Sequence, residues 1–73
     1  MEKLAKTKKR ILQYLEYKGI TKREFCEATK ISYPNLLGKS LESEFGGAQI
    51  GEILSHFSEI SPDWLILGVG SML

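Results

Sequence analysis

The sequence has little of what marks secreted, membrane or disulfide-linked proteins. Its 73 residues include one cysteine, Cys26, so no internal disulfide can form, which fits a reducing cytoplasm. No apolar run approaches the roughly 20 residues that a membrane-spanning helix needs. The basic N-terminus is not followed by the apolar segment of a signal peptide. We therefore expect a single cytoplasmic domain with no membrane contact.

The chain also lacks the patterns on which catalysis depends. It has one histidine, His56, and offers no metal-ligand constellation, phosphate-binding loop or nucleophile–base pairing. A chain this short leaves little room for a deep pocket. We expect no enzymatic activity, no cofactor and no small-molecule substrate, and we expect His56 at the surface. Cys26 is expected to face inward as a small hydrophobic residue, with a redox-sensing thiol as the less favoured alternative.

Basic side chains are missing from the second half of the chain. Residues 40–73 contain no Lys or Arg and carry a net charge of −5, whereas residues 1–39 carry +6. A folded domain divided in this way has a strong dipole, and its basic pole suits a polyanion. The overall charge of only +1 argues weakly against nucleic-acid binding. Chance segregation in a short chain is the alternative explanation.

Two helix starts lie close together within Ile20–Lys39. Thr21 and Glu24 have the spacing of a capping box, and Ser32 is a suitable N-cap for a second helix with Pro34 in its first turn. Apolar residues with the spacing of a hydrophobic staple flank both caps: Ile20 with Phe25, and Ile31 with Leu36. Two helices joined by so short a turn must cross steeply, as in a helix-turn-helix.

Periodicity and caps predict five helices, over residues 1–18, 22–29, 33–39, 48–57 and 62–67. In the first helix an apolar stripe is predicted at Leu4, Ile11, Leu12 and Leu15, with Tyr14 and Tyr17 at its edges in core packing. Lys3, Lys6, Lys9, Arg10 and Gln13 are expected to point away from it. The cluster Lys8-Lys9-Arg10 is either a solvated face or a set of phosphate contacts. Residues 40–47 are expected to form a loop anchored by Leu41 and Phe45.

The Ile20–Lys39 stretch resembles the helix-turn-helix of phage-repressor-like (XRE-type, lambda-repressor-like) DNA-binding domains. The resemblance extends to the closing segment, Ile60-Ser61-Pro62-Asp63-Trp64-Leu65 through Gly68. It implies a compact all-α, five-helix domain over residues 1–68, with a tail or linker at 69–73. It further implies sequence-specific binding of double-stranded DNA by a bacterial or phage transcriptional regulator, expected to be a repressor, with the recognition helix in the major groove.

The resemblance also assigns site residues. It implies base contacts from Tyr33, Pro34, Asn35, Leu37 and Gly38. Phosphate contacts are expected from Thr21, Lys22 and Arg23, where the start of a helix favours an anion, and from Ser32 and Lys39. The face of Leu37 is left open by its position, and Tyr33 has the alternative of a half-buried aromatic that never meets DNA.

Two positions depart from the family pattern. Lys30 stands where a glycine is usual, because the backbone there tends to need φ > 0, and Lys39 replaces an apolar residue. A homodimer on DNA is expected, with Trp64, Ile66 and Leu67 as interface candidates and Trp64 the one more suited to the core. The low net charge and both departures favour the alternative function, a protein-interaction module of antitoxin-like or anti-repressor type.

Overall fold

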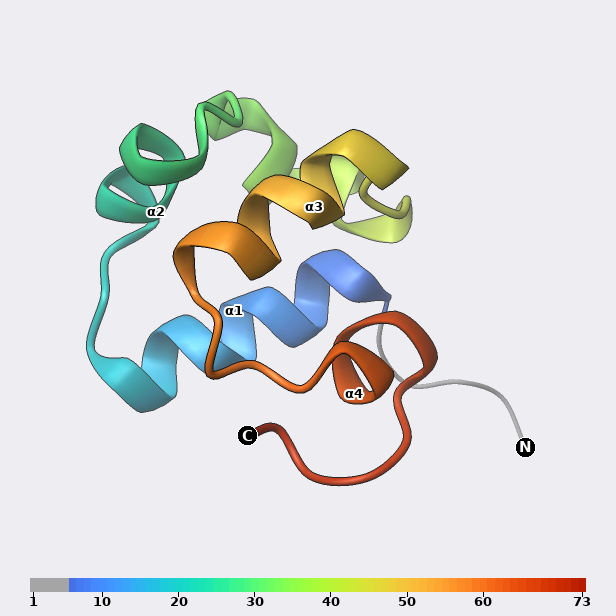
Figure 1. Ribbon diagram of the computed structural model, residues 1–73. Helices are drawn as coiled ribbons and strands as arrows, with labels where there is room; N and C mark the ends of the chain where they lie inside the picture. Colours follow the sequence, from blue (N-terminus) through green and yellow to red (C-terminus); the bar gives the residue numbers. More distant parts are fainter. Residues whose placement is uncertain (1–5) are drawn as a thin grey trace.

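The computed structural model describes residues 6–73, in which four α-helices and two 3-10 turns follow one another along the chain (Figure 1). The elements are α1 (Thr7–Lys18), α2 (Lys22–Thr29), η1 (Tyr33–Leu36), η2 (Gly38–Glu42), α3 (Gly47–His56) and α4 (Pro62–Leu67). No strand occurs within these residues, which confirms the all-α prediction. The five-helix count is not confirmed. The predicted contributions of Lys3 and Leu4 lie outside the described residues.

Helix α2 begins and ends as its sequence predicts. The Thr21 hydroxyl accepts a hydrogen bond from the Glu24 N–H at 3.1 Å, and the Glu24 carboxylate accepts one from the Thr21 N–H at 2.9 Å. The helix ends at Lys30, which adopts the left-handed conformation with φ 64° and donates its N–H to the Cys26 carbonyl. Such a conformation costs a non-glycine residue roughly 1–2 kcal/mol. The turn is therefore of the expected type, with a lysine in the position that favours glycine.

The predicted third helix, residues 33–39, is wrong. Tyr33–Leu36 forms a single 3-10 turn, Leu37 is extended with φ −124° and ψ 148°, and a second 3-10 turn starts at Gly38 with φ 52°. The Ser32 side chain makes no capping hydrogen bond to the backbone. The physical reason is weak helix propensity in a short segment that contains both a proline and a glycine. Burial of Leu36 then fixes the segment by tertiary packing.

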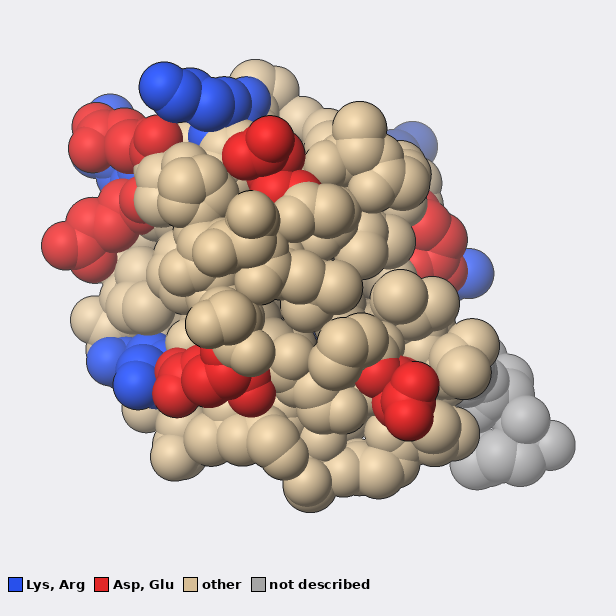
Figure 2. All heavy atoms as spheres, in the orientation of Figure 1, with Lys and Arg blue, Asp and Glu red and all other residues tan. Residues whose placement is uncertain are grey.

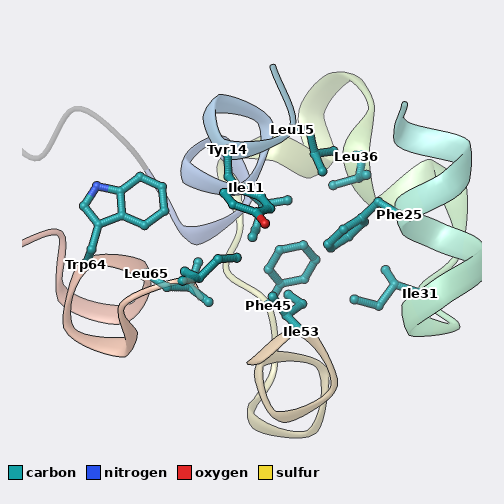
Figure 3. Packing of buried hydrophobic residues seen from close by; sticks show 11 residues of the cluster. Ile11, Tyr14, Leu15, Phe25, Ile31, Leu36, Phe45, Ile53, Trp64 and Leu65 are labelled. Carbon is teal, nitrogen blue, oxygen red and sulfur yellow. The ribbon is translucent and has the colours of Figure 1, made fainter. Parts of the chain in front are cut away.

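The core is built from side chains of every α-helix and of the turns between them (Figure 3). Three aromatic rings form its centre, with Phe25 stacked on Phe57 at a centroid distance of 5.6 Å and tilted against Phe45 at 6.4 Å. The aliphatic side chains around them are Ile11, Leu15, Ile31, Leu36, Ile53, Ile60 and Leu65. Because Ile31 and Leu36 flank the turn and are both buried, this core holds the helix-turn segment in place.

The C-terminal part closes over α1. Ser61 caps α4 by accepting a hydrogen bond from the Trp64 N–H at 3.4 Å, and Gly68 ends the helix in the left-handed conformation with φ 75°. The tail then passes beside α4 and returns to the α3–α4 linker (Figure 1), where the Met72 carbonyl accepts the Ser61 N–H at 2.8 Å. Residues predicted as a tail or linker are thus folded onto the domain.

Two side chains of α1 lie where they were not expected. Arg10 was predicted to point away from the core, yet it is only 5% exposed, and its guanidinium donates to the Leu65 and Ile66 carbonyls at 2.8 and 3.2 Å. Tyr17 was predicted to pack in the core, yet it is an exposed residue. The helix turns Arg10 toward the end of α4, where the last-turn carbonyls need donors.

Candidate nucleic-acid interface

The start of α2 is the first part of the candidate interface. The capping box already uses the N–H groups of Thr21 and Glu24, and it places the Glu24 carboxylate beside the helix start. The N–H groups of Lys22 and Arg23 are therefore the ones available to an external acceptor. The Thr21 hydroxyl accepts in the capping box and keeps its own hydrogen as a donor for a phosphate, whereas the Lys22 and Arg23 side chains add positive charge.

Across the turn, η1 places an aromatic ring next to this helix start. The Arg23 guanidinium lies over the Tyr33 ring, with 5.7 Å between its carbon and the ring centroid, and both residues are exposed. A cation over an aromatic face at this distance is attracted to it by about 0.5–1 kcal/mol at exposed sites. Tyr33 is therefore held outside the core, beside the positive charge that a phosphate would meet.

A row of exposed residues continues from this pair. Ser32, Pro34, Gly38 and Lys39 are all exposed, and Leu37 has 39% of its surface exposed. The extended backbone at Leu37 interrupts the helical period and turns the side chain outward, which settles the orientation that the sequence left open. The outer face of residues 32–39 thus combines an aromatic ring, an apolar side chain, a hydroxyl and an ammonium group.

Asn35 is held more firmly than its neighbours. Its side-chain oxygen accepts a hydrogen bond from the Lys8 ammonium at 3.3 Å, and its side-chain nitrogen donates to the Ser32 hydroxyl at 2.8 Å. The residue is half-buried. An asparagine amide has two donor hydrogens and two acceptor lone pairs, so each end of the Asn35 amide keeps one site for another partner.

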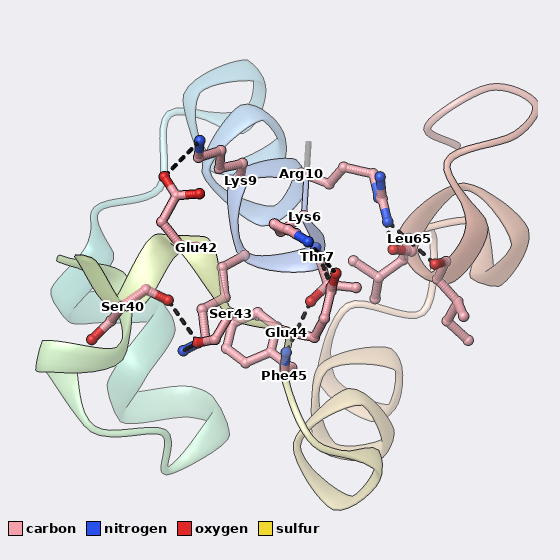
Figure 4. Close-up of polar contacts among 12 residues, drawn as sticks. Lys6, Thr7, Lys9, Arg10, Ser40, Glu42, Ser43, Glu44, Phe45 and Leu65 are labelled. Atoms are coloured by element: carbon pink, nitrogen blue, oxygen red, sulfur yellow. Dashed lines mark hydrogen bonds and ion pairs between the residues drawn. The ribbon is translucent and has the colours of Figure 1, made fainter. Parts of the chain in front are cut away.

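The cluster Lys8-Lys9-Arg10 as a whole forms neither a solvated face nor a set of side chains available to phosphates, the two predicted interpretations. Lys8 is 4% exposed, Arg10 is bound to α4, and only Lys9 remains at the surface, where it pairs with Glu42 at 3.4 Å. Figure 4 shows these contacts along α1. No sequence signal marked Lys8 as buried, because its partners are neutral residues 27 and 35 positions away.

Acids of the second half of the chain pair with three lysines of α1 and its N-cap, namely Lys6, Lys9 and Lys18. Lys6 lies 3.8 Å from Glu44, Lys9 3.4 Å from Glu42, and Lys18 3.1 Å from Glu59. The Glu44 carboxylate also accepts the Thr7 N–H at 2.8 Å, and this hydrogen bond lowers the pKa of Glu44 (Figure 4). Within residues 6–73, the basic side chains that form no ion pair and are not buried are Lys22, Arg23, Lys30 and Lys39. All four belong to the helix-turn segment.

The face over α3 and α4 has the opposite character. In Figure 2 it consists mostly of uncharged and acidic side chains, and basic side chains reach it only at its edges. The His56 Nε2 atom lies 3.4 Å from the Glu52 carboxylate of α3. Both residues are exposed, so His56 lies at the surface as predicted. A hollow of about 360 Å³ separates α3 from the turn and is lined by Lys30, Ser32, Asn35 and Glu52 among others. The negative charge of the Glu52 carboxylate disfavours phosphate binding in this hollow.

The three candidate interface residues of α4 differ in exposure. Trp64 is 8% exposed and packs in the core, whereas Ile66 and Leu67 are 46% and 56% exposed. Val69 and Leu73 of the tail are exposed as well. Only Ile66 and Leu67 among the predicted three therefore present a large apolar surface to solvent.

Other types of site find little support in the described part of the chain. Cys26 is partly buried, and burial raises the pKa of its thiol, which disfavours the reactive thiolate. Residues 6–73 bring together no group of three or more His, Cys, Asp or Glu side chains that could hold a metal ion. None of the helices described is long and apolar enough to cross a membrane. The chain matches no protein-family model, and no curated protein or solved structure matches it either.

Proposed function

We propose that this chain binds double-stranded DNA sequence-specifically, as a phage-repressor-like domain of a bacterial or phage transcriptional regulator, acting as a repressor. One observation carries the proposal. The ion pairs of residues 6–73 and the burial of Lys8 and Arg10 leave exposed, unpaired cations only around the helix-turn segment. A total charge of only +1 is thus compatible with one basic site, and that site is contiguous with the exposed row at residues 32–39.

Each part of the segment has a role in the proposal. The start of α2, with Lys22 and Arg23, lies against the phosphate backbone, and Lys39 contacts it from the other end of the segment. Tyr33 and Leu37 meet base edges in the major groove, where an apolar side chain favours a thymine methyl. Asn35 offers a donor and an acceptor to an adenine. Pro34 and Gly38 have no polar side chain and allow close approach of the backbone.

The proposal includes a homodimer on DNA. Ile66 and Leu67 are the apolar side chains that a second copy would cover, and a two-fold operator would then present half-sites about one helical turn apart. Trp64, which is 8% exposed, packs in the core and offers this surface little area.

An NMR titration of the labelled chain with random-sequence duplex at low salt tests DNA binding without knowledge of the operator. We expect shifts concentrated at residues 21–23 and 32–39. Three phosphate-facing cations, Lys22, Arg23 and Lys39, predict that log K falls against log salt with a slope of about −3 per chain. Arg23→Ala should weaken binding to every sequence, whereas Lys18→Ala, which removes a lysine paired with Glu59, is the matched control and should not. Shifts confined to residues 6–10 would contradict the proposed site.

Sequence specificity needs a separate test, in which a binding site is selected from a random duplex library. Asn35→Ala should relax the preference at one A·T position, while Lys22→Ala should lower affinity for all sequences alike. An unchanged preference in Asn35→Ala would show that the proposed base-contact register is wrong.

The second candidate function is a protein-interaction module on the same fold. The irregular backbone between Tyr33 and Glu42 favours it, and so do the exposed apolar side chains of Ile66, Leu67, Val69 and Leu73. A complete absence of duplex binding at low salt would favour the protein-interaction module over DNA binding.

A further inference from the structure

Lys8 is the most unusual charged residue of the described chain. It is 4% exposed, and the groups that contact its ammonium are neutral: the Asn35 side-chain oxygen at 3.3 Å, the Ser43 hydroxyl at 3.0 Å and the Phe45 ring, whose centroid is 5.6 Å away. Burying an ammonium group is costly unless hydrogen bonds compensate for the lost water. A methionine would fill similar space without that cost, so stability alone does not explain a lysine here.

Lys8 connects α1 to η1 and to the residue that directly follows η2. Asn35 belongs to η1, and Ser43 directly follows η2 and donates its own hydroxyl to the Ser40 carbonyl at 2.9 Å (Figure 4). One ammonium group therefore holds the segment at two points, although the segment lacks the hydrogen-bond ladder of an α-helix.

The chemistry of the ammonium group also fixes the orientation of the Asn35 amide. An ammonium group can only donate, so it selects the oxygen of the amide and turns the nitrogen toward the Ser32 hydroxyl. One lone pair on the oxygen and one hydrogen on the nitrogen then remain. A bidentate contact with adenine needs one acceptor and one donor side by side.

We propose that Lys8 is a positioning residue for base recognition. From inside the domain it orients the Asn35 amide so that one donor and one acceptor are presented to a base edge, and it touches no DNA itself. This inference rests on the proposed function, because it assigns Lys8 a role in the specificity of that site. It also predicts a property of the free protein, namely a single orientation of the Asn35 amide.

The experiment compares Lys8→Met with two matched controls on a duplex selected for the wild-type chain. Lys9→Met removes a positive charge from the neighbouring position without touching Asn35, and Arg10→Met removes a buried cation that donates hydrogen bonds to the Leu65 and Ile66 carbonyls of α4. For each variant, affinity is measured for the selected duplex, for duplexes substituted at each A·T pair, and for random duplex. Free-protein NMR records the contacts of the Asn35 side-chain amide protons with Ser32.

In the wild-type chain, substitution of the A·T pair read by Asn35 should lower affinity roughly 5- to 150-fold. Lys8→Met should reduce this discrimination to the level of Asn35→Ala, and combining the two changes should reduce it no further. Both controls should keep the discrimination, and affinity for random duplex should fall no more in Lys8→Met than in Lys9→Met. The Asn35–Ser32 contact should be lost in Lys8→Met alone.

The experiment distinguishes failure of the proposed function from failure of the role proposed for Lys8. If the wild-type chain does not bind duplex, the proposed function and the recognition role of Lys8 both fail. If the wild-type chain binds and Lys8→Met retains full discrimination or the Asn35–Ser32 contact, only the role of Lys8 is overturned. Should Lys8→Met not fold, Lys8→Gln carries the same test, because its neutral amide is one atom too short to reproduce the ammonium contact.

Discussion

Replacing Arg10 by methionine should destabilise the domain strongly without weakening the proposed binding to DNA. Arg10 is 5% exposed, and its guanidinium donates hydrogen bonds to the Leu65 and Ile66 carbonyls, at 2.8 and 3.2 Å. These carbonyls lie in the last turn of α4, where no later turn of the helix can supply donors. The positive charge there also complements the negative end of the helix.

The magnitude follows from these contacts. A hydrogen bond from a charged donor contributes about 1.5–3 kcal/mol, and methionine preserves most of the packing of the arginine stem. We therefore expect Arg10→Met to lower the free energy of unfolding by about 2–4 kcal/mol. Since a domain of this size has a total of about 4–11 kcal/mol, the melting temperature should fall by roughly 10–30 °C.

Urea unfolding monitored by helical circular dichroism measures the overall loss, and Trp64 fluorescence reports the docking of α4, which carries this residue. Lys9→Met is the matched control, because the exposed Lys9–Glu42 pair is expected to contribute at most about 1 kcal/mol. Affinity for random duplex should fall no more in Arg10→Met than in Lys9→Met. A loss of stability below about 0.5 kcal/mol in Arg10→Met would refute the reasoning.

Three further predictions concern residues outside α4. The hydrogen bond from the Thr7 N–H lowers the pKa of Glu44, so the stability that this carboxylate contributes is present above its unfolded pKa, about 4.3, and is lost as the pH falls through the lower folded pKa. In urea titrations, Glu44→Gln should therefore lose less stability than the wild type between pH 5 and pH 3. An equal loss in the two proteins would contradict this prediction. Glu42→Gln should free Lys9 from its ion pair and so make it available to a DNA phosphate. Affinity for random duplex should then rise at low salt, and the slope of log K against log salt should become steeper by about 1. An unchanged slope would argue against this role of Lys9. Lys30→Gly should raise the free energy of unfolding by up to about 1 kcal/mol, and with it the urea midpoint, because glycine adopts φ 64° without strain. A lower urea midpoint would show that the left-handed lysine does not destabilise the domain.

Local rules made the helix ends predictable. The capping box of α2, the serine cap of α4 and the helix end at Gly68 follow from short patterns of neighbouring residues, whereas the left-handed Lys30 was suggested only by the glycine usual there in the family pattern. Buried positions at helical spacing, such as Ile53 in α3, followed from the same reasoning. These features depend on interactions within about four residues, which a single sequence displays directly.

Two of the failures, at Lys8 and Arg10, arise from long-range contacts. Arg10 and Lys8 are polar, so periodicity assigned them to solvent, but acceptors that lie 27 to 56 positions later in the sequence allow both to be buried. The segment 33–39 was predicted as a helix from its serine cap and first-turn proline, whereas its proline and glycine together favour two short turns. Neither the acceptors nor the packing of Leu36 can be recognised before the chain has folded.

The irregular backbone of the candidate recognition segment changes how its specificity should be understood. In an α-helix, the residues that face a groove follow from a period of 3.6, so the register alone assigns them. Here Leu37 breaks the period, and the orientation of the segment depends on Leu36 in the core and on the Lys8 contacts at Asn35 and Ser43. Substitutions inside the domain should therefore alter sequence preference as strongly as substitutions on its surface. In a regular recognition helix, by contrast, interior substitutions would mainly alter stability.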